Sequence, residues 1–160
     1  MRPIYRVRQF WQAITAAPGR EPPCALPPGL AELYRGMPRA DRAHGLRTYQ
    51  RLVAEGQVPA AVAAAALLHD VGKARAGVRL WHRVAHVLAG GRPAGWLARQ
   101  PGVAGLMAHA ALGAELLAAA GAGAETVALV RHHHDDPASL GWPAAQRALL
   151  EALQRADEAS

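Results

Sequence analysis

Residues 58–73 read VPAAVAAAALLHDVGK, an alanine-rich stretch that ends in an imidazole, a carboxylate and a glycine. Alanine is the best helix former, and proline is favoured where a helix begins because the first turn leaves amide groups unpaired. We predict a helix from Pro59 to His69, with Gly72 as its left-handed cap. His69 and Asp70 then stand side by side where a very apolar helix ends. The pair is either a chance feature of a capped helix end or part of a metal site, since imidazole binds transition metals and a carboxylate can bridge two of them.

The rest of the chain favours the same fold class. Of its 160 residues, 51% are hydrophobic, and 38 are alanine, whereas the β-branched residues typical of strands are scarce. We therefore predict an all-α protein, a compact helical bundle over residues 30–160. Its further helices are expected near residues 38–54, 79–89, 103–120, 125–133 and 144–158, between glycines and prolines.

Residues 1–29 are predicted to form an N-terminal part ahead of this bundle. Residues 2–16 carry apolar side chains at helical spacing, and residues 18–29 are a proline-rich connector. The net charge of +6 lies within residues 1–51, which hold nine arginines and three acids. The basic amphipathic helix packs on the bundle by default. A weak contact with an anionic membrane surface stays open, and we expect no stable nucleic-acid partner.

The sequence favours a cytoplasmic protein. Its longest apolar run, residues 58–68, falls well short of the roughly 20 residues that span a bilayer, and no signal-peptide core follows the N-terminal arginines. The single Cys24 cannot form an internal disulfide, which suits a reducing compartment and excludes a cysteine-rich zinc site.

Eight histidines are many for a chain of this length, and several lie in apolar helical segments where an unpaired imidazole is costly. The order His44, then His69-Asp70, then Asp157 resembles the H…HD…D signature of the HD superfamily of metal-dependent phosphohydrolases. The stretch HDVGK is close to that superfamily's HDIGK form. The resemblance covers roughly residues 30–158. It implies an all-α bundle in which His44, His69, Asp70 and Asp157 hold one metal ion.

Two more stretches are similar to the binuclear branch of that superfamily. Residues 109–117, HAALGAELL, look like its H-x-x-x-G-a-x-x-L helix, and residues 127–135, VALVRHHHD, look like its I-x-x-HHE segment with aspartate in place of glutamate. This implies a second metal held by His109, His133 and His134, with Asp70 as the bridge. Adjacent residues on an ideal helix point about 100° apart, so His132 in place of His134 stays open unless the helix ends there. Gly141-Trp142-Pro143 is only a partial match to the Gly-Tyr-Pro of HD-GYP phosphodiesterases.

The resemblance implies hydrolysis of a phosphate ester, either in a phosphorylated small molecule or in a nucleotide. A mixed His/Asp set favours Mn, Fe, Co, Ni or Zn, one or two ions per chain. Asp70 would act in catalysis through the metals, while Lys73 and Arg131 would neutralise transition-state charge. Lys73 is the one lysine among 18 basic residues. The alternatives are an HD-fold regulatory or nucleotide-binding module with little catalysis and, further off, a di-iron HD oxygenase.

Overall fold

The protein is described by a computed structural model, which covers residues 19–56, 58–75 and 101–160; of residues 75 and 101–107 only the backbone is described. The described residues are helical and contain no strand, so the prediction of an all-α fold is confirmed. The helices predicted over residues 2–16 and 79–89 lie outside these ranges. In chain order the described elements are α2 (Pro28–Gly36), α3 (Arg39–Glu55), α4 (Ala60–Leu68), α5 (Val71–Arg75), α7 (Pro101–Ala119), α8 (Ala124–Arg131), the 3-10 turn η1 (Pro137–Ser139) and α9 (Ala144–Glu158).

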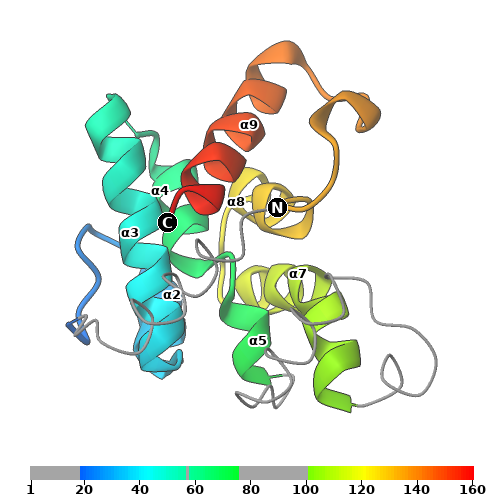
Figure 1. Cartoon of the computed structure of the whole chain (residues 1–160). Helices are drawn as coiled ribbons and strands as arrows, with labels where there is room; N and C mark the ends of the chain where they lie inside the picture. The colour runs from blue at the N-terminus through cyan, green and yellow to red at the C-terminus, as the bar shows by residue number, and fades with distance from the viewer. Residues whose placement is uncertain (1–18, 57, 76–100) are drawn as a thin grey trace.

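Helix α4 forms the centre of the bundle. Every residue from Val62 to Asp70 is buried, as expected of a helix that is apolar on all sides. Its small alanine side chains allow other helices to pack closely around it, and α3, α8 and α9 do so (Figure 1). Large apolar residues of those neighbours, among them Leu52, Leu129 and Leu153, complete the core.

Gly72 does not cap α4 in the left-handed conformation, so that prediction was wrong. Helix α4 ends at Leu68, the chain turns through His69 and Asp70, and Gly72 lies inside α5. Among the described glycines, positive φ angles occur at Gly56, Gly121 and Gly141. The backbone of α5 instead packs directly on α7 here, because a Cβ on Gly72 would lie 2.0 Å from the carbonyl oxygen of His109.

A second glycine permits the same kind of close backbone contact, here between α3 and α4. A Cβ on Gly45 of α3 would lie 2.6 Å from the carbonyl oxygen of Leu67, near the end of α4. Gly45 follows His44, and Gly72 is two residues after Asp70, so both close backbone contacts occur next to candidate metal ligands. Glycine therefore brings the helices that carry these ligands together.

Two further expectations concern the division of the chain into parts and the presence of a membrane-spanning helix. The predicted boundary after residue 29 falls inside α2, and the division of the chain into two parts stays a prediction. Within the described ranges, no helix combines the length and the apolarity that crossing a membrane requires.

Candidate metal centre

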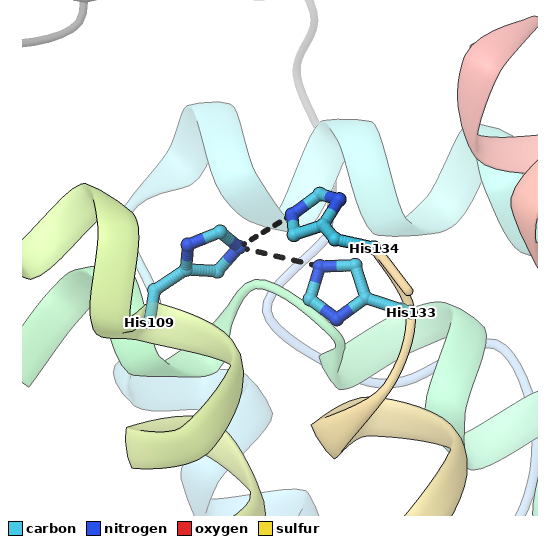
Figure 2. Close-up of side chains that lie close together, drawn as sticks. All are labelled: His109, His133 and His134. Atoms are coloured by element: carbon cyan, nitrogen blue, oxygen red, sulfur yellow. Dashed lines mark hydrogen bonds between the residues drawn. The ribbon is translucent and has the colours of Figure 1, made fainter. Parts of the chain in front are cut away.

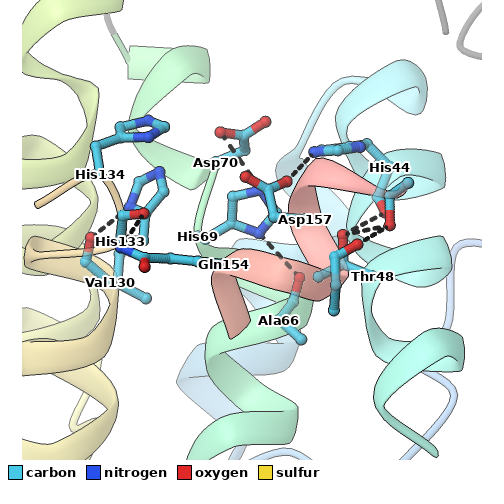
Figure 3. A network of polar contacts seen from close by, with 12 residues as sticks. His44, Thr48, Ala66, His69, Asp70, Val130, His133, His134, Gln154 and Asp157 are labelled. Carbon is cyan, nitrogen blue, oxygen red and sulfur yellow. Dashed lines mark hydrogen bonds and ion pairs between the residues drawn. The ribbon is translucent and has the colours of Figure 1, made fainter. Parts of the chain in front are cut away.

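Side chains from five chain segments meet at one place in the bundle. His44 comes from α3, His69 and Asp70 from the turn between α4 and α5, and His109 from α7. The remaining side chains follow α8 or lie near the end of α9. Together the structure gathers the seven predicted ligands, His44, His69, Asp70, His109, His133, His134 and Asp157 (Figures 2 and 3).

One half of the cluster combines imidazoles with carboxylates. His44 Nε2 lies 2.6 Å from Asp157 Oδ1, and His69 Nε2 lies 3.3 Å from the same oxygen. His44, His69 and Asp70 each offer a ligand atom, and these atoms lie within 4.8 Å of one another. This is a donor set of the kind that transition metals prefer.

The other half consists of three imidazoles. His109 Nε2 lies 3.2 Å from both His133 Nε2 and His134 Nε2, and the three nitrogens converge on one point (Figure 2). Asp70 connects this half to the first, because its Oδ1 lies 3.4 Å from His109 Nε2 and 3.7 Å from His69 Nε2. The placement of Asp70 between the two groups is the one that a bridging carboxylate requires. The assignment of all seven residues as ligands stays a prediction.

Two of the buried imidazoles are oriented by their own helices. His69 Nδ1 donates to the Ala66 carbonyl at 3.0 Å, and His133 Nδ1 donates to the Val130 carbonyl at 2.7 Å. In each case the acceptor lies three residues earlier, in the last helical turn. This hydrogen bond directs Nε2 into the centre, the usual arrangement of a metal-binding histidine.

The Nε2 atom of His69 shows how well the residues fit a metal ion. It is fully buried and makes no hydrogen bond of good geometry; the nearest carboxylate oxygens are Asp157 Oδ1 at 3.3 Å and Asp70 Oδ1 at 3.7 Å. A buried polar atom without a partner costs free energy unless something satisfies it. A cation held between this nitrogen and the two nearby carboxylates would do so.

Two carboxylates and the groups beside them set the electrostatics of the site. Burial acts to raise the pKa of Asp70, but Lys73 and His69 hold it well below its usual range. Burial opposes the shift at Asp157 too, where His69 and His44 keep the pKa of the carboxyl low. Burial and the charge of His69 lower the pKa of His133 to about 2.

His69 is the exception among these histidines. Burial alone would lower its pKa, but the charges of Asp70 and Asp157 raise it to about 9. In the metal-free protein this imidazole therefore carries a proton at neutral pH. The same negative charge that retains the proton would also attract a metal ion to the site.

His132 and His134, which the sequence left as alternatives, differ clearly in position. Helix α8 ends at Arg131, and His132 leaves the helical conformation with φ −110° and ψ 14°. His132 pairs with Asp135 at 2.7 Å and packs edge-on against Trp142, whereas His134 contacts His109. The structure therefore brings His134, together with His133, to the cluster.

The two predicted charge-neutralising residues also differ. Lys73 Nζ lies 2.5 Å from Asp70 Oδ2, so it is part of the site. Arg131 is exposed, and within the described part of the chain no hydrogen bond or ion pair joins it to the cluster. Its predicted role has no contact to support it.

Sequence reasoning missed one residue at the site. Gln154 of α9 donates through Nε2 to the carbonyls of His133 and Asp135, at 3.2 and 2.7 Å (Figure 3). Its position three residues before Asp157, on the same side of a helix, was the available signal.

Comparison with known proteins agrees with this geometry. The family model described as HD domain matches residues 43–160, a range that includes all seven residues of the cluster. No curated protein and no solved structure matches the chain. The family match covers well over half of the sequence, and so the chain belongs to the HD domain family.

Proposed function

We propose that this protein is a metal-dependent phosphohydrolase of the binuclear, HDIG-type branch of its family. The observation that carries the proposal is the convergence of five imidazoles and two carboxylates on one place, with the buried Nε2 of His69 beside the carboxylates of Asp70 and Asp157. In this proposal His44, His69, Asp70 and Asp157 hold one divalent transition metal. Asp70 is shared with a second, which His109, His133 and His134 hold.

Divalent metal ions bound here would supply Lewis acidity toward a phosphoryl oxygen and a water of lowered pKa. The chain's own residues set the conditions for this chemistry. Asp70 stays ionised because Lys73 and His69 lie beside it. His133 and His134 stay neutral at pH 7, since the pKa values are about 2 and about 4. Their lone pairs are therefore available without the loss of a proton.

Lys73 is the candidate for binding the substrate's phosphate. Its ammonium group pairs with Asp70 Oδ2, at the edge of the centre, and is partly exposed. A compact cation at this position attracts an anionic group that approaches the metals. The exposed His134 marks the side from which solvent reaches the cluster. A phosphorylated small molecule or a nucleotide of the cytoplasm is the substrate class that we propose.

The proposal is tested on untagged protein loaded with Mn²⁺. We expect about two metal ions per chain by elemental analysis, and hydrolysis of p-nitrophenyl phosphate, bis-p-nitrophenyl phosphate or a nucleotide. Asp70→Asn preserves the shape of the side chain and should lose both metal and activity. Glu151→Gln, an exposed change on α9, is the matched control. A folded wild-type chain that takes up no Mn, Fe, Co, Ni or Zn would refute the proposal.

A further inference from the structure

The segment that carries His133 and His134 lies outside any regular helix. Helix α8 ends at Arg131, and residues 132–135 form turns and a bend before η1 begins at Pro137. The ladder of hydrogen bonds that makes a helix rigid is therefore missing where two of the predicted ligands lie. A turn hydrogen bond from the Asp135 N–H to the His132 carbonyl and the bond from His133 Nδ1 to the Val130 carbonyl hold the segment locally. Contacts from outside the segment have to supply the rest.

Gln154 supplies such a contact from a different helix. Its amide nitrogen has two hydrogens and makes two hydrogen bonds, to the carbonyls of His133 and Asp135. The two acceptors are two residues apart, so a single side chain binds both sides of His134. This fixes the backbone from which the His134 side chain projects.

Helix α9 is itself firmly held. Leu150, Leu153 and Ala156 are buried in the core, and Asp157 is one helical turn beyond Gln154. The helix therefore ties the ligand of one half of the cluster to the backbone of the other half. Any displacement of the 132–135 segment relative to Asp157 requires the loss of the Gln154 hydrogen bonds.

We infer that Gln154 is a positioning residue, which fixes His133 and His134 relative to Asp157 and thereby sets the affinity of the three-histidine half of the centre. The inference rests on the proposed function, because it needs metal ions in both halves. Groups that orient metal ligands typically change metal affinity by about 10- to 100-fold when they are lost. Gln154 itself contacts neither metal nor substrate; it acts through the backbone of the two histidines.

The variant Gln154→Met tests this, since methionine has a similar volume and no amide donor. The full chain, freed of metal, is titrated with Mn²⁺, and free Mn²⁺ is followed by its electron paramagnetic resonance signal. We expect wild type to bind two ions. Gln154→Met should bind the first with unchanged affinity and the second about 10- to 100-fold more weakly. The spectrum of coupled Mn²⁺ pairs should weaken at equal metal concentration.

Gln146→Met is the matched control, because it makes the same substitution on α9 two turns earlier, at another partly exposed glutamine. It should behave as wild type. Gln154→Glu is a second variant that keeps the shape of the side chain but loses both donors. Its added negative charge would tighten metal binding by attraction alone, so weaker binding of the second ion in this variant supports the inference strongly.

The possible results separate the two proposals. A folded Gln154→Met variant that binds both ions as tightly as wild type overturns the positioning role and leaves the proposed function intact. Equal weakening of both ions also overturns it, because the effect would then not be specific to the three-histidine half. A wild-type chain that binds no metal overturns both proposals.

Discussion

Replacement of Gly72 by alanine should disturb the candidate metal centre without changing the side chain of any predicted ligand. Gly72 lies in α5, two residues after Asp70, and its backbone packs on the turn of α7 that carries His109. In Gly72→Ala the new methyl group would lie 2.0 Å from the His109 carbonyl oxygen and 2.7 Å from the Gly113 nitrogen. Both of these atoms belong to backbone, which cannot rotate away as a side chain can.

The size of the effect follows from these distances. Real Cβ atoms essentially never approach another heavy atom closer than 3.0 Å, so α5 and α7 must separate by about 1 Å. Asp70 moves with α5 and His109 with α7, and the 3.4 Å between their ligand atoms changes accordingly. Overpacking of this kind costs about 1–3 kcal/mol in unfolding free energy. A misplacement of about 1 Å at a catalytic centre can lower the rate about 100-fold.

Three measurements check this prediction. Elemental analysis should show fewer metal ions per chain in Gly72→Ala than in wild type, and phosphate-ester hydrolysis should fall about 100-fold. Thermal unfolding should occur about 2–4 °C lower for each kcal/mol lost. Gly36→Ala is the control, because nothing lies within 4 Å of the position where its Cβ would stand, and it should match wild type. A Gly72→Ala protein with full metal content, full activity and unchanged thermal stability would refute the reasoning.

Three further predictions concern the histidines. His134→Ala should lose one of two bound metal ions, whereas His132→Ala should retain both by elemental analysis, since His132 pairs with Asp135 away from the cluster. The metal-free protein should have its highest free energy of unfolding near neutral pH in denaturant titrations. Below pH 6.5 stability falls, because His133 has a folded pKa of about 2 and takes up a proton only on unfolding. Above neutral pH the stability that comes from the raised pKa of His69 is lost as the pH rises through about 9, so a flat profile from pH 5 to 9.5 contradicts the prediction. Zn²⁺ binding at pH 7 should release the proton of His69, and calorimetry in buffers of different ionisation enthalpy measures that release. At pH 10 the release should vanish, because the pKa of about 9 leaves His69 already deprotonated.

The fold was predictable from the sequence where local preference and packing agree. The alanine-rich segment before His69 favours a helix by its intrinsic propensity, and its apolar side chains allow that helix to be buried on all sides. Both preferences agree, and the predicted bounds of α4 were therefore correct to within a residue or two. Gly72 was misread because a glycine after a helix usually marks a left-handed cap. Its partner, the His109 carbonyl, is 37 residues further along the chain and invisible to a local pattern.

The site was predictable to the extent that its side chains form a known pattern. The pattern named residues that the structure gathers, but it could not decide between His132 and His134, because that depends on where α8 ends. It also named Arg131, which is exposed. Gln154 was missed because its partners are backbone carbonyls, which no residue pattern identifies; its spacing of three residues from Asp157 was the one signal, and by itself that spacing predicts no partner.

The main-chain acceptors of His69 and His133 have a consequence for how the proposed metal centre would exchange ions. Since Ala66 and Val130 accept through backbone carbonyls in the last turns of α4 and α8, no side-chain substitution at these two positions can abolish the bonds. The ring of His69 therefore keeps its orientation as long as α4 is folded, whether or not an ion is present, and that of His133 does so as long as α8 and the Gln154 hydrogen bond are intact. We therefore expect an emptied centre to keep its shape and to accept a different divalent ion without refolding. The identity of the bound metal would then follow its supply in the surroundings.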